Sequence, residues 1–232
     1  MTTLPDLPAV TAAIVEITNA KRVEAKLARV TVSRELTTAA KAYADVLART
    51  KVFSHTADGT TMSARIEKSG YQACTAAENL AMHQSSRGFA TRELAVSAME
   101  GWLNSPGHAK NILMSEATEI GVAIAKASDK DPKFLLVQLF GRPQSLSFEF
   151  QVSNTSTVPV TMAFAGKTSV VAPKMALSQS SCETGPLIIK AAGARAFEAR
   201  YEAASKNYVV SEPAAGTKAP LTVDVRDRIK VK

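Results

Sequence analysis

The spacing of apolar residues changes at about residue 143, and this change restricts the folds open to the chain. Before it, apolar positions recur every three or four residues, as in 36–47, which is the spacing of an amphipathic helix. After it, apolar and polar residues alternate, as in 146–152, which is typical of half-buried strands. The sequence therefore predicts two domains, a helix-containing domain over residues 1–142 and an all-β accessory domain over residues 143–232.

In the first domain, periodicity and capping residues predict helices joined to a small sheet. The expected helices cover 9–28, 33–49 with Ser33 as the N-cap, Thr61 or Ser63 to Ser69, 90–102, and a further turn from Asn104 or Ser105 that has Pro106 at its first position. Two strands are expected at 120–125 and 133–140, and the polar loop 128–132 between them predicts an antiparallel hairpin. These elements indicate an α+β domain built in layers.

In the second domain, short alternating segments separated by turn residues indicate a sandwich of roughly immunoglobulin-like architecture. The expected strands are 146–152, 158–164, 187–189, 197–201, 208–210 and 221–225, and one of the turn signals is 213–216. Residues 191–204 are rich in Ala, Arg and Glu, so a helix is the alternative there, which would make this domain α+β.

Composition excludes several classes of protein. The chain of 232 residues is 46% hydrophobic and 21% charged, which is typical of globular proteins. No uninterrupted apolar run approaches the roughly 18 residues of a membrane span, and no signal peptide is visible at the first residues. The net charge of +7 is spread thinly, without a Lys/Arg block, so we expect no nucleic-acid partner. The charge indicates either a solvated basic surface or weak attraction to anionic polymers of the cell envelope.

The two cysteines, Cys74 and Cys182, lie one in each predicted domain. Their spacing is neither that of a zinc knuckle nor that of a redox CxxC pair. Two interpretations stay open: an interdomain disulfide in an exported protein, or two independent buried thiols.

Five short motifs occur in a fixed order along the first domain. They are Phe53-Ser54-His55, Ala77-Glu78-Asn79-Leu80-Ala81, Trp102-Leu103-Asn104-Ser105-Pro106-Gly107-His108-Ala109-Lys110-Asn111-Ile112-Leu113, Thr118-Glu119-Ile120-Gly121-Val122-Ala123 and Val137-Gln138-Leu139-Phe140-Gly141. The set resembles the CAP superfamily (cysteine-rich secretory proteins, antigen 5 and pathogenesis-related proteins), and within it the short bacterial SCP-type domain. Asn19 and Arg22 also match the N-x-x-R of the first helix in that family. The resemblance covers about residues 9–142 and implies an α-β-α sandwich, with Trp102 in the core.

The resemblance also implies a candidate metal site. Members of the family often place two histidines and two glutamates around a central cleft, where they hold a divalent metal. Here His55, Glu78 and His108 match three of these positions, Ala77 replaces the usual glycine, and residues 103–105 offer no second glutamate. Two imidazoles and one carboxylate suit Zn²⁺ with a water in the fourth position, and Ca²⁺ is the other candidate ion. If the chain is an enzyme, Glu78 is the expected catalytic base.

Each site residue also has a structural interpretation. His55 then ties a loop to backbone carbonyls, Glu78 braces a helix start, and His108 is an ordinary surface histidine. Asn111 and Gln138 are weaker candidates for the cleft, and His83 matches no ligand position, so we expect it to be structural. No nucleotide-binding motif is present, so we expect no nucleotide or organic cofactor.

Two functions follow from the resemblance. The first is an exported bacterial binding module for a lipid, sterol, ion or protein, located outside the cell, in the periplasm or in the cell envelope. The alternative is a metal-dependent, peptidase-like hydrolase that uses His55, His108 and Glu78. The two differ in whether these three side chains converge in an open cleft.

Overall fold

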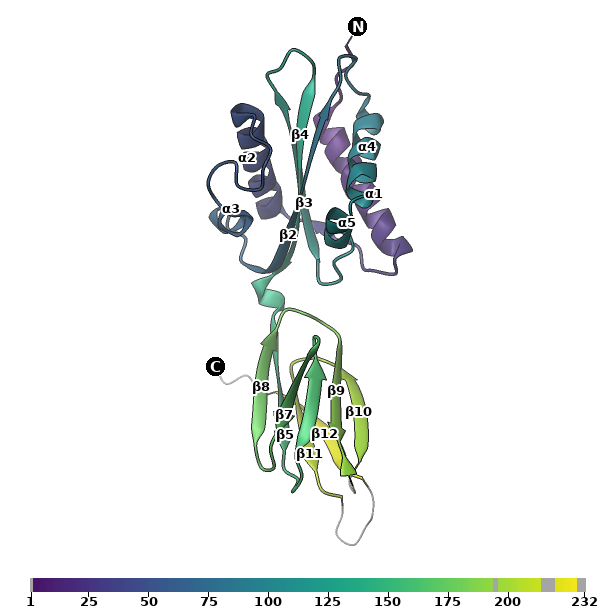
Figure 1. Cartoon of the computed structure of the whole chain (residues 1–232), viewed down its shortest axis with the longest axis vertical. Coiled ribbons are helices and arrows are strands. Elements are labelled where there is room, and N and C mark those ends of the chain that lie inside the picture. The colour runs from purple at the N-terminus through teal and green to yellow at the C-terminus, as the bar shows by residue number, and fades with distance from the viewer. Residues whose placement is uncertain (1, 194–195, 214–219, 229–232) are drawn as a thin grey trace. The chain divides into compact units, whose positions relative to one another are not determined.

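The structure is a computed structural model, and it describes residues 2–193, 196–213 and 220–228 (Figure 1). The chain divides into two compact units, Met1–Ser145 and Leu146–Lys232. Within the described ranges, no helix is both long enough and apolar enough to cross a membrane.

The first unit combines five helices with a four-stranded sheet in its described residues. The helices are α1 (Leu7–Glu24), α2 (Arg34–Thr50), α3 (Met62–Lys68), α4 (Thr91–Leu103) and α5 (Pro106–Ile112). The strands are β1 (Thr31–Val32), β2 (Ala73–Gln84), β3 (Glu119–Ala127) and β4 (Lys133–Pro143), and a short 3₁₀ helix, η1 (Gln144–Leu146), follows.

The sheet lies between two layers of helices. Its strand order is β1-β3-β4-β2, in which β1 is parallel to β3 and the other pairs are antiparallel. Figure 1 shows α2 and α3 on one face and α1, α4 and α5 on the other. Each face buries its own hydrophobic core, one around Trp102 and Ile14 and the other around Tyr43 and Leu36. Strand β2 forms one edge of the sheet. The other edge is formed by the two-residue β1 and by the part of β3 with which β1 does not pair.

Local signals in the sequence explain where several elements begin. Ser33 caps α2 as predicted, since its hydroxyl accepts from the Leu36 backbone N–H at 3.3 Å. The first helix starts at Leu7, two residues earlier than expected, because the Asp6 side chain caps it. The predicted hairpin is confirmed, and its strands β3 and β4 are joined through the polar loop.

Strand β2 was recognised in the sequence only as a motif. Glu78 and Asn79 lie in the middle of this strand, so the interpretation of Glu78 as the brace of a helix start is wrong. Side chains alternate between the two faces of a strand. Glu78 therefore points to the side of α2 and α3, while Asn79 points to the side of α5.

The described residues of the second unit form strands apart from short turns. One sheet has the order β10-β9-β6-β7 and the other β12-β11-β5-β8. Their bounds are β5 (Phe148–Asn154), β6 (Val160–Phe164), β7 (Lys167–Val171), β8 (Ala176–Ser181), β9 (Pro186–Ala191), β10 (Phe197–Glu202), β11 (Lys206–Ser211) and β12 (Thr222–Asp227). The two sheets share one core, to which Phe150 and Tyr208 contribute from one sheet and Met162 and Ile189 from the other.

Two expectations for the second unit are corrected or left aside. The alternative of a helix over 191–204 is wrong, because β10 pairs antiparallel with β9 there. The turn expected at 213–216 lies largely outside the described residues.

Cys74 and Cys182 are both disulfide-bonded, so neither is the free buried thiol of the second interpretation.

Candidate functional site

The three predicted site residues come from three different elements. His55 lies in the loop between α2 and α3, Glu78 is in the middle of β2, and His108 is in the first turn of α5. Pro106 occupies the first position of α5, where its missing N–H leaves no hydrogen bond unmade. The sequence had placed His108 in this turn, and the structure agrees.

A buried ion pair lies at the centre of the site. The Arg65 guanidinium donates from Nη2 to both carboxylate oxygens of Glu78, at 3.0 Å to Oε1 and 2.8 Å to Oε2. The Glu78 side chain is only 4% exposed and the Arg65 side chain only 9%. Removing one partner of such a deeply buried ion pair strongly destabilises the folded protein, because the remaining charge has no counter-charge.

His55 is the exposed partner of the same carboxylate. Its Nδ1 lies 2.7 Å from Glu78 Oε1, and its side chain is 57% exposed. Because an ionised carboxylate only accepts, the Nδ1 atom carries the proton. The other ring nitrogen, Nε2, is then the atom of His55 left for a ligand, as in the carboxylate–histidine pairs that orient metal-binding imidazoles.

Tyr43 and Arg65 together fix the loop that carries His55. The guanidinium of Arg65 stacks over the Tyr43 ring at 3.5 Å and donates to the backbone carbonyls of His55 and Thr60. The Tyr43 hydroxyl donates to the Ser54 carbonyl. It also accepts from the backbone N–H of Ala57, in the same loop, at 3.0 Å. The position of His55 is therefore set by α2 and α3 rather than by the loop alone.

Arg65 is a site residue that sequence reasoning missed. It lies on the predicted third helix, but no motif or spacing in the sequence connects it to Glu78, which is 13 residues further along. Only the tertiary packing of α3 against β2 brings the two together.

His108 faces the same region from α5. Burial lowers the pKa of His108, and the charge of His55 lowers it further. The His108 backbone carbonyl accepts from Asn79 Nδ2 at 3.2 Å, which attaches the first turn of α5 to the sheet.

A buried polar network continues from α5 through the sheet. Asn111 donates to the Glu78 carbonyl at 3.2 Å and to Asn79 Oδ1 at 2.8 Å. Asn79 in turn donates to Gln138 Oε1 at 2.9 Å, and Gln138 donates to Thr18 on α1 at 3.0 Å. Asn79, Gln138 and Thr18 are fully buried. Gln138 therefore acts inside the core, where it links the position of α5 to α1.

His83 and Trp102 have structural roles. The His83 ring lies edge-on to Phe89, its Nδ1 is 3.3 Å from the Ser97 hydroxyl, and burial lowers its pKa. Trp102 is 1% exposed, and its indole N–H donates to the Leu80 carbonyl at 2.9 Å.

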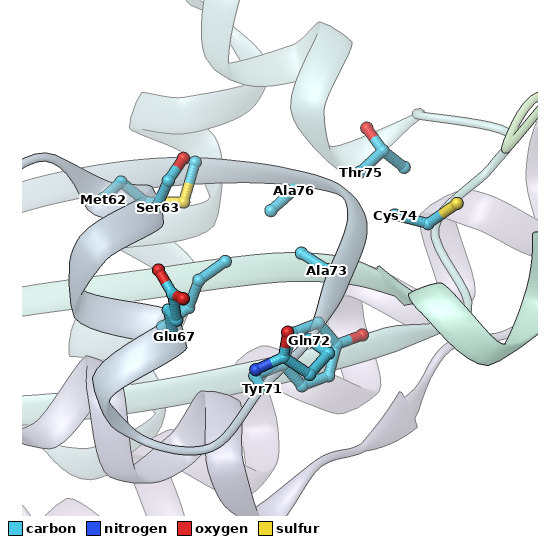
Figure 2. Close-up of a pocket in the computed structure, with 10 residues that line it drawn as sticks. Met62, Ser63, Glu67, Tyr71, Gln72, Ala73, Cys74, Thr75 and Ala76 are labelled. Carbon is cyan, nitrogen blue, oxygen red and sulfur yellow. The ribbon is translucent and has the colours of Figure 1, made fainter.

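A separate pocket of about 420 Å³ opens between α3 and the first part of β2 (Figure 2). Figure 2 shows Met62, Ser63 and Glu67 on the helix side and Ala73 to Ala76 on the strand side. His55, Glu78 and His108 do not line this pocket. The pocket therefore lies beside the site formed by His55, Glu78 and His108 and is separate from it.

Comparison with known families identifies the first unit. The model of the cysteine-rich secretory protein family, CAP, matches residues 15–140, which is more than half of the chain. The chain belongs to the CAP family. The resemblance predicted from the five motifs is thereby confirmed. Comparison with curated proteins gives no match.

Three solved structures resemble this CAP protein over a little more than half of its length. An extracellular protein containing an SCP domain from Bacillus anthracis has 26% identity and a TM-score of 0.49, covering 59% of this chain and 41% of that chain. An outer surface protein of Borrelia burgdorferi has 24% identity and a TM-score of 0.48, covering 58% and 93%. A cysteine-rich secretory protein of Staphylococcus aureus has 20% identity and a TM-score of 0.41, covering 58% and 39%. The CAP chain thus spans less than half of the first and third of these proteins.

The N-x-x-R residues of the CAP domain have a clear structural role. Asn19 bonds both backbone groups of Val30, donating to its carbonyl at 3.0 Å and accepting from its N–H at 2.7 Å. Arg22 is fully buried and donates to four backbone carbonyls, those of Ala28, Ile112, Met114 and Ala117. Burial lowers the pKa of Arg22. Because two of these carbonyls lie at the end of α5, Arg22 also supports the helix that carries His108.

The side chains of the CAP site do not fit a three-ligand metal centre in the arrangement observed. Over the described ranges, no three His, Cys, Asp or Glu side chains form a group able to hold a metal ion. Glu78 instead has a guanidinium on its two oxygens and an imidazole on one of them. The metal expectation therefore stays a prediction from the resemblance, with His55 and His108 as its remaining candidate ligands.

Proposed function

We propose that this CAP protein is an exported binding module and that the cluster of His55, Glu78 and His108 is its ligand site. The observation that carries the proposal is the state of the Glu78 carboxylate, which is almost fully buried and bonded to Arg65 and His55. A general base has to lie within hydrogen-bond reach of the group that loses the proton, about 2.6–3.2 Å between heavy atoms, directly or through one water. Here the carboxylate orients an imidazole, and that role suits binding better than proton abstraction.

The ligand meets His55 first, because this side chain is the exposed member of the cluster. Its Nε2 accepts a hydrogen bond or coordinates a cation when the ring is neutral, and the ring attracts an anion when it is protonated. The ligand classes implied by the resemblance are an ion, a lipid or sterol, and a protein. Zn²⁺ and Ca²⁺ are the ions to test first.

Export is supported by the state of the cysteines. Both are disulfide-bonded, and disulfides persist in oxidising compartments such as the periplasm and the cell exterior. The proposed location is therefore the cell exterior, periplasm or envelope of a bacterium. The net charge of +7 favours peripheral contact with anionic envelope polymers there.

The second unit contributes to binding in this proposal. Its two sheets around one core support the roughly immunoglobulin-like architecture predicted from the sequence. Sandwiches of this kind commonly serve as docking modules, with the fold as a support and the loops as the site.

The alternative function is a metal-dependent, peptidase-like hydrolase. What favours it is the electrostatic effect of His55 on His108, whose pKa is lowered by burial and further by the charge of His55. In that case, Glu78 would have to leave Arg65 in order to act as a base.

Calorimetry combined with a hydrolysis screen separates the two functions. Chelator-treated protein is titrated with Zn²⁺ and then Ca²⁺, and peptide and ester substrates are offered with and without Zn²⁺. The variants are His55→Ala, His108→Ala and Glu78→Gln, and His83→Ala is the matched control outside the cluster. We expect no turnover, and any Zn²⁺ heat should disappear in the first two variants but persist in the control. Turnover that falls by about 100-fold or more in Glu78→Gln, at a temperature where circular dichroism shows that the variant is still folded, would establish the hydrolase instead.

A further inference from the structure

The edge of the sheet opposite the His55 cluster lacks a neighbouring strand over most of its length. Strand β3 has nine residues, and β1 pairs only with the first two of them, Glu119 and Ile120. Seven positions, nine minus two, therefore have a paired neighbour only on the side of β4. In the described part of the chain, no backbone hydrogen bond joins the outer side of these positions to another segment.

The hydrogen-bond pattern shows which residues of β3 present their backbone to this edge. The Ile120 carbonyl accepts from the Ser33 N–H at 2.9 Å, on the side away from β4. Alternate residues of an antiparallel strand share this direction. Val122, Ile124 and Lys126 therefore present their N–H and C=O groups outward. Val122 is 2% exposed, so Ile124 and Lys126, which line the groove described below, are the positions that another strand can reach.

The other edge of the sheet is treated differently. On β2 the outward carbonyls of Glu78 and Leu80 are occupied by side chains, the Asn111 amide at 3.2 Å and the Trp102 indole at 2.9 Å. These contacts block the addition of a strand there. The contrast shows that β3, rather than β2, is the edge available for pairing.

A groove of about 420 Å³ follows the open edge. Its floor includes Ile124 and Lys126 of β3, one wall is the α2 surface with Lys41 and Arg49, and Leu7 of α1 lies at the other wall. Asp45 on the α2 wall is paired with Lys41 at 2.8 Å. Arg49 and Lys126 are exposed. With three cations and one carboxylate, the groove carries a net positive charge of two (three minus one).

We propose that this groove binds an extended acidic segment of a partner protein, which pairs as an additional strand with Ile124 and Lys126 of β3. The backbone hydrogen bonds supply affinity, and the flanking side chains supply selectivity. Alternate side chains of an added strand point to opposite faces. Acidic residues of the partner face Lys41 and Arg49 on α2, and apolar residues face Leu7 on α1. The site is independent of the His55 cluster, so either proposal can fail without the other.

Fluorescence anisotropy on the full chain tests this proposal. The probe is a labelled peptide of alternating glutamate and valine, about seven residues long, which is enough to span Ile124 and Lys126 and to reach the walls of the groove. Two matched probes accompany it, the same peptide with alternate N-methylated amides and a peptide with lysine in place of glutamate. We expect binding of the first probe alone, and weaker binding as the salt concentration rises.

Charge-reversal variants locate the binding. Arg49→Glu and Lys126→Glu should each weaken the first probe about tenfold, because both side chains flank the groove. Lys167→Glu, an exposed lysine of the second unit, is the matched control and should leave the affinity within about twofold. Hydrogen exchange should show new protection of the amides of Ile124 and Lys126 in the complex.

Three results would overturn the proposal. Equal binding of the N-methylated probe would mean that no strand is added. Failure of the first probe to bind would exclude an acidic partner of this kind. Sedimentation of the free chain as a dimer that Lys126→Glu dissociates would identify a second copy as the occupant of the edge.

Discussion

At the residue scale, Arg65 determines the chemistry of the CAP cluster. Its guanidinium is the counter-charge of a carboxylate that is otherwise removed from water. Methionine at this position keeps an unbranched apolar side chain but loses every donor. We expect Arg65→Met to lower the free energy of unfolding by about 3–5 kcal/mol, as when one partner of a buried pair is removed.

Urea unfolding of Arg65→Met measures this loss. The double variant Arg65→Met/Glu78→Gln is the control, because it removes both charges and should recover part of the stability. A loss in Arg65→Met below about 1 kcal/mol, the range of surface ion pairs, would contradict the burial of this pair.

Two histidines make the stability depend on pH. Burial lowers the pKa of both His83 and His108 in the folded chain, and the charge of His55 lowers that of His108 further. The unfolded chain therefore takes up protons first as the pH falls, starting near the ordinary histidine pKa of about 6.5. Stability is complete above that pH and is lost as the pH falls toward the lowered values of the folded state.

Melting curves between about pH 7.5 and pH 5.5 test this dependence, because most carboxylates stay ionised in that range. We expect a lower melting temperature at the acidic end. The variant His83→Gln/His108→Gln should show a smaller difference between the two ends. An equal difference in the variant would mean that other groups cause the pH dependence.

At the element scale, close packing of α2 against β3 sets the spacing of one helical layer. A Cβ at Gly121 would lie 2.3 Å from the Leu36 carbonyl carbon and 2.4 Å from the Thr37 nitrogen, both backbone atoms of α2. Gly121→Ala therefore has to push the helix from the sheet. We expect a loss of about 1–3 kcal/mol or more in the free energy of unfolding.

Gly101 is the matched control for this substitution. It lies within α4, and an added Cβ there would meet no atom within 4 Å. Gly101→Ala should be neutral or should stabilise the chain by up to about 1 kcal/mol, because alanine favours the helix. Chemical denaturation of both variants gives the comparison, and similar values for the two would disprove the close approach at Gly121.

The sequence predicted the helices better than it predicted the strands. Ser33 and the apolar spacing of α2 carry their information locally, so that helix could be identified. Strand β2 starts with an alanine-rich stretch of low strand propensity, and it forms because β4 lies beside it in the fold. Strands β7 and β8 were missed because they are short, largely polar and partly exposed.

The candidate site was also predictable only where local motifs mark its residues. Motifs supplied His55, Glu78 and His108, whose burial and neighbours only the structure reveals. Arg65 depends on a contact between α3 and β2, so no local pattern contains it.

At the scale of the whole molecule, each unit has its own hydrophobic core, and the two cysteines are oxidised. Maleimide labelling of the chain, unfolded without reductant, should therefore add no mass. The same experiment after reduction should add two labels, one for each cysteine. Intact mass spectrometry reads both results, and a label before reduction would show that a thiol is free.

The alternation along β2 also limits how this chain can change during evolution. Glu78 meets Arg65 on one face of the strand, and Asn79 meets Gln138 on the other. A single-residue insertion or deletion before Glu78 would exchange the two faces. It would place a charge in the core and an amide beside the guanidinium at the same time. Loops such as 128–132 tolerate changes in length, whereas β2 can change by substitution but not by a single-residue insertion or deletion before Glu78.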